Sequence, residues 1–313
     1  MQLTPRLVAM LATPPLMWAC NAVVGRLAID SIGPLWLNAL RWVVAFALLL
    51  PLGWAALGTA RARAQIRERW QVLAILGLIG VGAYNALQYM ALRTSTPLNV
   101  TLIASSSPVW TLLIGALAYG AVPTRQQLAG AVLSLCGVAL VLARGEPAAL
   151  ADVRLVQGDL LMLLAIIGWS FYSWMLARPP ASMRGEARPA WSWAEFLVAQ
   201  CVFGVAWAVG AAGLGELVVP TGPIQWSWQL AAAILFVAVG PSIIAYRLWG
   251  LAVGEAGPAM AAIFYNLTPL FAAILSAAVI GESPQAFHAV AFGLIVGGIF
   301  VSSRTRTEPP RSR

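Results

Sequence analysis

Residues 158–177 read GDLLMLLAIIGWSFYSWMLA, and this stretch decides the class of the protein. It carries one charged residue, Asp159, at its second position. A helix needs about 20 mainly apolar residues to cross the hydrocarbon core of a bilayer. The stretch has that length and composition, so we predict a membrane-spanning helix over 158–177.

Similar apolar stretches follow one another along the whole chain. The connections between them are short, and the longest ones, 60–69, 144–157 and 178–192, are polar. We therefore predict an all-α integral membrane protein with ten transmembrane helices and no separate soluble domain. Besides 158–177, the predicted helices span 7–28, 34–57, 70–92, 97–119, 125–143, 192–213, 228–250, 257–279 and 286–303.

The composition supports this class. Of the 313 residues, 60% are hydrophobic and 10% are charged, and the mean hydropathy is +0.82. A soluble domain carries roughly 25% charged residues, so the composition excludes a soluble enzyme and a disordered chain. The apolar run that begins at Leu7 continues to Ala28 with no A-x-A cleavage site, so we expect a retained first helix and not a signal peptide.

The arginines predict the orientation. The chain has 19 arginines and no lysine, and they fall mostly between apolar runs, which argues against a nucleic-acid partner. Cytoplasmic loops are enriched in arginine, and the distribution predicts that both termini are cytoplasmic. The predicted inside set is Arg6, Arg61, Arg63, Arg67, Arg69, Arg125, Arg178, Arg184, Arg188, Arg304, Arg306, Arg311 and Arg313; the outside set is Arg93, Arg144 and Arg154.

The two halves of the chain share a pattern. An offset of 161 maps Pro97 and Pro108 onto Pro258 and Pro269, and the same offset maps Gly120 onto Gly281. Near the start of each half, Trp18 matches Trp169, which places Asn21 opposite Tyr172. We predict two five-helix repeats, 1–145 and 146–313. Five is an odd number of crossings, so the second repeat should be inverted relative to the first, as in many transporters.

These residues also resemble a known family. The segment Gly158-Asp159-Leu160-Leu161, with Gly168-Trp169-Ser170-Phe171-Tyr172, is similar to the opening of an EamA repeat of the drug/metabolite transporter superfamily. The segment Asn266-Leu267-Thr268-Pro269-Leu270, with Ile280-Gly281-Glu282, is similar to its close. The first half matches more loosely, through Trp18, Arg41-Trp42, Ala91-Leu92, Pro97 and Ser107-Pro108, and it has Gly120-Ala121 where the family usually has Gly-Glu.

The resemblance implies secondary transport of small metabolites, frequently amino-acid export from bacteria. We therefore predict an exporter of amino acids and related metabolites in the bacterial inner membrane, working by alternating access and without strong proton coupling. Other substrates (nucleosides, sugars or cations) and a proton-coupled antiporter remain as alternatives. The expected partners are the substrate and the lipid bilayer, and the sequence is compatible with a monomer without fixing the oligomeric state.

Polar and aromatic residues inside the predicted helices are the candidate substrate-binding residues, because a polar group in hydrocarbon is costly unless it pairs or faces a cavity. Packing between helices and the interfacial aromatic belt are the competing interpretations. We further interpret Pro108 and Pro269, near the middle of their helices, as hinges. The predicted binding residues are Trp18, Asn21, Tyr84, Asn85, Gln88, Trp110, Trp169, Tyr172, Tyr246, Tyr265 and Asn266.

Side chains that could catalyse a reaction or bind a metal ion are few. The carboxylates lie near predicted helix ends, and His288, the one histidine, begins the last helix, where we expect an interfacial role. Cys20, Cys136 and Cys201 have no metal-ligand spacing. We predict no catalytic residues, no metal site and no cofactor, and hence not an enzyme.

The remaining arginines, Arg26, Arg41 and Arg247, lie within or at the edges of helices. We expect their side chains to extend toward the membrane interface, and capture of a substrate carboxylate is the alternative.

Overall fold

The computed structural model describes residues 3–28, 30–95, 97–143, 145–146, 148, 156–280 and 285–304. Within these residues the chain is helical and contains no strand. The helices that match single predicted spans are α1 (Pro5–Ala28), α2 (Pro34–Gly53), α9 (Arg125–Leu142), α10 (Gln157–Ala177), α11 (Trp193–Val218) and α16 (Ala286–Ser303).

Four predicted spans are divided into shorter elements. The third is α5 (Trp70–Leu76), η1 (Gly77–Ala83) and α6 (Tyr84–Ala91), and the eighth is α12 (Trp228–Val237), η5 (Ala238–Ile244) and α13 (Ala245–Ala256). The fourth is α7 (Pro97–Ser105) and α8 (Ser107–Tyr119), and the ninth is α14 (Pro258–Tyr265) and α15 (Leu267–Ile280).

The all-helical membrane class is confirmed. In the described part of the chain, nine helical segments are long and apolar enough to cross a bilayer, and Ser107–Tyr119 is a tenth, shorter apolar helix. The fourth predicted span is divided at Ser106 into α7 and α8, and α8 is this shorter apolar helix. The predicted ends of two other spans, 213 and 250, were too early, since α11 continues to Val218 and α13 to Ala256.

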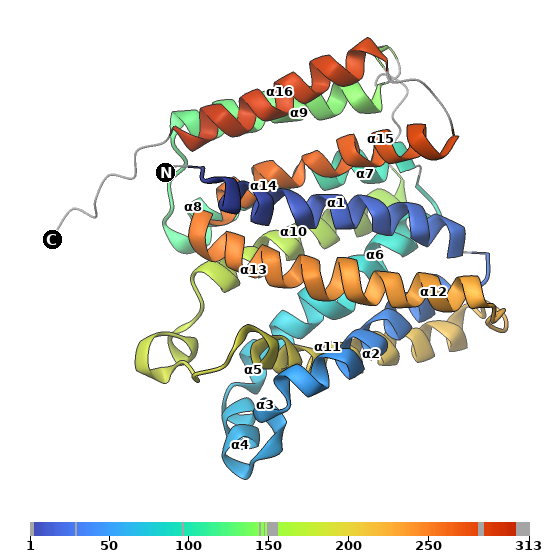
Figure 1. The fold of residues 1–313 in the computed structure, drawn as a ribbon, viewed down its shortest axis with the longest axis vertical. Helices are drawn as coiled ribbons and strands as arrows, with labels where there is room; N and C mark the ends of the chain where they lie inside the picture. Colours follow the sequence, from blue (N-terminus) through green and yellow to red (C-terminus); the bar gives the residue numbers. More distant parts are fainter. Residues whose placement is uncertain are drawn as a thin grey trace, which may run out of the picture.

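Figure 1 shows the helices running side by side across the bundle, with α1 beginning on the side where α16 ends. The pair α9 and α16 forms one edge, and α2 packs against α11 toward the other. At the first edge two glycines allow the backbones to approach: a Cβ on Gly130 would lie 2.6 Å from the carbonyl oxygen of Gly298. The central helices, including α1, α6, α10, α13 and α14, lie between these edges.

Two helices contain a π-helical segment that the sequence analysis did not predict. These segments, η1 and η5, are each seven residues long and are separated by the same offset of 161 that relates the prolines. A π segment leaves carbonyl groups out of the regular hydrogen-bond ladder, and such segments are frequent at functional sites. Asn38 on α2 donates to the carbonyls of Val81 and Gly82 in η1, at 3.4 and 3.2 Å.

The helices divided near Pro108 and Pro269 break immediately before those prolines. Ser106 separates α7 from α8, and Asn266 separates α14 from α15, so each proline lies in the first turn of the following helix. Proline is tolerated there because the first-turn amides have no partner within the helix. The two sites that we predicted to bend are therefore helix interruptions.

Four exposed tryptophans lie at helix ends, a position typical of the aromatic belt at a membrane interface. Trp54, Trp70, Trp226 and Trp228 are exposed, and each lies within two residues of the end of an apolar helix. On the side where α1 begins, α3 (Ala55–Gly58), α4 (Ala60–Glu68) and the segment 178–192 fill two of the polar connections.

Candidate substrate-binding site

A cavity of about 90 Å³ lies among the central helices, between the two halves of the chain. Its wall comes from α1, α6 and α7 of the first half and from α10, α13, α14 and α15 of the second. Most of the predicted binding residues meet there: Trp18, Asn21, Tyr84, Asn85, Gln88, Trp169, Tyr246 and Tyr265.

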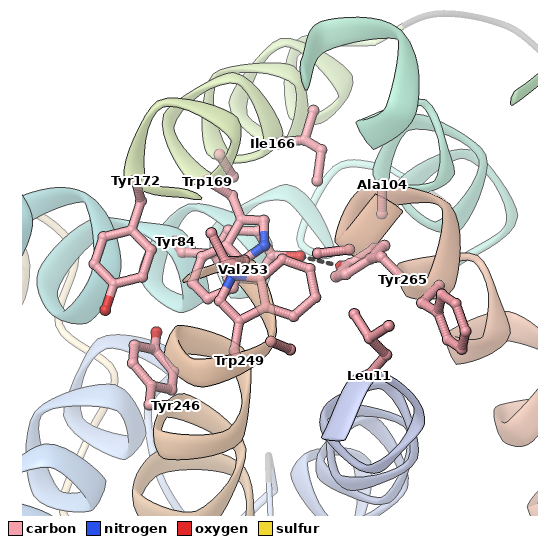
Figure 2. Close-up of a cluster of buried hydrophobic side chains, with 14 of the residues drawn as sticks. Leu11, Tyr84, Ala104, Ile166, Trp169, Tyr172, Tyr246, Trp249, Val253 and Tyr265 are labelled. Carbon is pink, nitrogen blue, oxygen red and sulfur yellow. Dashed lines mark hydrogen bonds between the residues drawn. The ribbon is translucent and has the colours of Figure 1, made fainter. Parts of the chain in front are cut away.

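One side of the cavity is a cluster of aromatic rings, which we call the aromatic cluster: Trp18, Tyr84, Trp169, Tyr172, Tyr246, Trp249 and Tyr265. Trp169 lies at its centre (Figure 2), with its ring centroid 5.1 Å from Trp18, 5.3 Å from Tyr84 and 5.5 Å from Trp249. The 5.1–5.5 Å separations and mostly tilted or edge-on orientations are favourable for aromatic pairs. The cluster therefore closes this side of the cavity with packed rings.

Polar groups of the aromatic cluster hold its helices together. The hydroxyls of Tyr84 and Tyr265 are hydrogen-bonded to each other, which joins α6 to α14 (Figure 2). The Tyr246 hydroxyl donates to the carbonyl of Gly80 in η1, and Trp18 Nε1 donates to the carbonyl of Pro241 in η5, at 3.2 Å. Carbonyls of both π-helical segments thus accept hydrogen bonds from residues that line the cavity.

Three polar atoms of the cavity residues find no hydrogen-bond partner among the residues that the structure describes: Trp169 Nε1, Ser105 Oγ and Thr268 Oγ1. Buried polar groups are nearly always paired, and an unpaired one costs about 1–3 kcal/mol. These atoms provide one N–H donor and two hydroxyls that can donate or accept. Each atom is buried in a side chain that lines the cavity, and a small polar molecule that reached it would supply the missing partner.

Three predicted binding residues do not line this cavity. Trp110 is half-buried, and its Nε1 donates to Ser106 Oγ at 3.0 Å. Asn266 faces α9, where its amide donates to Ser134 Oγ at 3.0 Å. Tyr172 points toward α11, and its hydroxyl donates to Gln200 Oε1 at 3.1 Å.

Tyr172 belongs instead to a second cavity of about 250 Å³. This cavity lies on the side of the bundle where α10 ends and α11 begins, and Tyr172, Gln200 and Arg247 line it. Tyr246 lines both cavities. The aromatic cluster therefore lies between the two cavities.

Several cavity residues were not in the predicted set: Ala22, Thr101, Ala104, Ser105, Thr268, Pro269 and Ala272. Four of the seven are alanine or proline, whose side chains carry no polar signal. The repeat pattern could have identified two of the others, because Ser105 and Thr268 lie beside the matched prolines Pro108 and Pro269.

One of the three intramembrane arginines, Arg41, differs from our expectation. Arg41 does not extend to the interface: its side chain is fully buried (0% exposed) and bonds Ser242, Asn21 and Tyr89. Arg247 is exposed, and its guanidinium lies 4.5 Å from the ring centroid of Trp193 at the start of α11. The side chain of Arg26 lies outside the described residues.

Acidic and metal-binding groups are peripheral to the cavity. Asp159 is buried in the first turn of α10, where it bonds the Ser95 hydroxyl and accepts from the amide of Val156. His288 Nδ1 accepts from the amide of Gln285 at the start of α16. Within the described ranges, no group of three or more His, Cys, Asp or Glu side chains could hold a metal ion.

Several known proteins are similar to this chain in sequence or fold. An uncharacterized transporter of Archaeoglobus fulgidus is 25% identical to this chain over 94% of it and 96% of the relative. The aromatic amino acid exporter YddG of Ancylobacter novellus is 25% identical, over 93% of this chain and 94% of the relative. A solved crystal structure has the same fold, with a TM-score of 0.72 and 22% identity over 95% of this chain and 96% of that chain.

The model of the EamA-like transporter family matches twice, over residues 6–143 and 156–304. The two matches together cover most of the chain. The protein is a multi-pass membrane protein, and it belongs to the EamA-like transporter family.

Proposed function

We propose that this protein exports amino acids and related small metabolites, and that the cavity of about 90 Å³ is its substrate site. The observation that carries the proposal is a set of polar atoms without a partner in the described residues, each in a side chain of the cavity that five aromatic residues help to line: Trp169 Nε1, Ser105 Oγ and Thr268 Oγ1. Hydroxyls and indole N–H groups can hold the ammonium and carboxylate groups of an amino acid. The likeness to an aromatic amino acid exporter supports the same substrate class.

The size of the cavity suggests how it is used. A cavity of about 90 Å³ has room for several water molecules, and so for the ammonium and carboxylate groups of an amino acid. A larger side chain requires the rings of the aromatic cluster to move apart. We infer that this movement opens the path from the cavity to the second cavity beyond Tyr246.

We further propose that the repeats 1–145 and 146–313 are inverted and rock against each other. The matched pair of π-helical segments and the matched interruptions before Pro108 and Pro269 support two equivalent sets of bending points. In this proposal the two prolines mark hinges of the rocking movement.

We place the protein in the bacterial inner membrane with both termini cytoplasmic, since arginine is concentrated on that side of the predicted spans. We also propose transport without strong proton coupling, because none of the described residues that line the cavity is a carboxylate or a histidine. Transport that a protonophore inhibits at fixed membrane voltage would contradict this part.

The test is counterflow of labelled amino acids in proteoliposomes containing the purified protein. We expect exchange of a subset of amino acids, and we expect Asn21→Ala, at the cavity wall, to reduce it. Asn266→Ala is the matched control, because Asn266 faces Ser134 on α9 and not the cavity. Folded protein that shows no exchange above protein-free liposomes would rule out amino acids. Nucleosides, sugars and cations would then be tested in the same assay.

A further inference from the structure

Arg41 is a buried cation enclosed by α1, α2, α6 and η5. It lies on α2, seven residues after Pro34, and its side chain is fully buried. The guanidinium extends to η5, where its Nε and Nη2 donate hydrogen bonds to the Oγ of Ser242, at 3.0 and 2.8 Å. Nη1 donates to Asn21 Oδ1 at 3.2 Å and to the Tyr89 hydroxyl at 3.5 Å.

All these partners are neutral. The ion pair present in the described part of the chain joins Arg69 to Glu68 and does not involve Arg41. An arginine keeps its charge at any physiological pH. A buried charge without a counter-ion is unfavourable, because hydrogen bonds to neutral groups only partly replace the lost hydration. The bundle therefore holds a positive charge that a nearby anion would stabilise.

The charge lies one side chain behind the cavity wall. Asn21 lines the cavity, and its Oδ1 accepts the hydrogen bond from Arg41. Two more amide side chains, Asn85 and Gln88, line the same cavity. Charges interact more strongly in a low-dielectric interior than in water, so the guanidinium favours negative charge and disfavours positive charge at this end of the cavity.

We propose that Arg41 makes the cavity selective for substrates that carry a carboxylate, which binds at the wall formed by Asn21. This inference rests on the proposed substrate site and names the feature of the substrate that the site recognises. Arg41 acts through Asn21 as a specificity-determining residue. The proposal excludes simple organic cations as preferred substrates.

The first test measures the melting temperature of the purified wild-type protein in detergent with four matched probes. L-Phenylalanine and 3-phenylpropionate carry a carboxylate; L-phenylalanine methyl ester and 2-phenylethylamine do not. We expect the two carboxylates to raise the melting temperature and the other two probes to leave it unchanged. Equal shifts with all four probes, or no shift with either carboxylate, would overturn the proposal.

The second test compares three variants by competition in the counterflow assay. Arg41→Gln should weaken competition by the carboxylates about tenfold or more relative to the ester and the amine. Arg41→Lys keeps the charge and should keep the preference. Ser242→Ala is the control: it removes a neutral partner of Arg41 and should also keep the preference. An unchanged preference in Arg41→Gln, or a lost preference in Arg41→Lys, would contradict the proposal. If Arg41→Gln does not fold, the proposal is tested by the substrate preference of Arg41→Lys and by the melting temperatures of the wild-type protein with the four probes.

These tests separate the inference from the proposed function. If 3-phenylpropionate stabilises the protein but amino acids neither bind nor exchange, carboxylate recognition stands and amino-acid export fails. If amino acids exchange and the methyl ester competes equally well, export stands and the role of Arg41 fails.

Discussion

The hydroxyl groups of Tyr84 and Tyr265 are hydrogen-bonded to each other at the wall of the cavity, so one residue from each half of the chain closes the contact between α6 and α14. Both rings belong to the aromatic cluster around Trp169. The contact lies between the two repeats that the family model matches. Its strength therefore contributes to how firmly the two halves hold together in this conformation.

A double-mutant cycle measures that strength. Tyr84→Phe and Tyr265→Phe each keep the ring and remove one hydroxyl, so each should lower the free energy of unfolding by roughly 1 kcal/mol. The double variant should cost less than the sum, with a coupling of about 0.5–1.5 kcal/mol, because both changes remove the same bond. Unfolding in detergent is the measurement. Tyr84→Phe combined with Tyr172→Phe, whose hydroxyl bonds Gln200, is the control and should be additive.

The hydroxyls of Ser105 and Thr268, which have no partner in the described part of the chain, predict a separation of stability from transport. Ser105→Ala and Thr268→Val should leave the melting temperature unchanged or slightly raised, because they remove a buried polar group that is not paired. The same changes should raise the KM for the exchanged substrate about tenfold, since they remove bonds to charged groups. Ser170→Ala should do the reverse: the Ser170 hydroxyl bonds Thr111 and the carbonyl of Ile166 and does not line the cavity. A lower melting temperature with unchanged KM in Ser105→Ala would refute the assignment.

The edge formed by α9 and α16 should depend on the absence of a side chain at one glycine. Gly298→Ala should lower stability by about 1–3 kcal/mol, because the new Cβ would lie 2.6 Å from the carbonyl oxygen of Gly130. Gly293→Ala, on the same helix, meets no atom of the described residues within 4 Å, and it should raise stability by about 0.5–1 kcal/mol through helix propensity. Thermal unfolding of the two variants is the check, and equal effects would show that this close approach is unimportant.

The helix interruptions before Pro108 and Pro269 predict an effect on transport rate. Pro108→Ala and Pro269→Ala should change the exchange rate severalfold while the melting temperature moves little, because alanine favours a continuous helix where the helix is now interrupted. Pro51→Ala, a proline inside α2 and away from both interruptions, should leave the rate unchanged. Unchanged flux in both hinge variants would remove the hinge proposal.

The sequence predicted the membrane class and the helix order well, because a run of about 20 apolar residues between polar connections is rarely anything but a membrane-spanning helix. It also marked the regions of the two helix interruptions near Pro108 and Pro269, since proline cannot continue a helix undisturbed. The π-helical segments η1 and η5 were missed. A π segment needs one residue of extra winding, and neither composition nor periodicity marks it.

The candidate site was harder to predict residue by residue. Asn266 and Tyr172 have polar groups in apolar helices, as the cavity residues do, but their partners Ser134 and Gln200 lie on neighbouring helices that the sequence does not place. A helix that is apolar on most faces gives little information about which face meets the cavity. The sequence pattern therefore could not distinguish a polar residue that lines the cavity from one that is hydrogen-bonded to a neighbouring helix.

The surroundings of Arg41 were also hard to predict from the sequence. Snorkelling accounts for an arginine near the end of a span, but Arg41 lies about 10 Å from the start of α2 at about 1.5 Å per residue. This depth argued against a position of the Arg41 side chain at the membrane interface. The buried partner, Ser242, belongs to the other half of the chain, and only the fold brings it to Arg41.

The central claim is that substrate occupies the cavity beside the aromatic cluster, and protection of an introduced cysteine tests it most directly. In a background whose three native cysteines are replaced, Ala272→Cys places a thiol on the cavity wall. Gln225→Cys places one in an exposed loop as the control. With an amino acid that the protein exchanges, labelling of the Ala272→Cys thiol by a water-soluble reagent should slow severalfold, while labelling of the control should not change. Undiminished labelling at position 272 at saturating substrate would contradict the account.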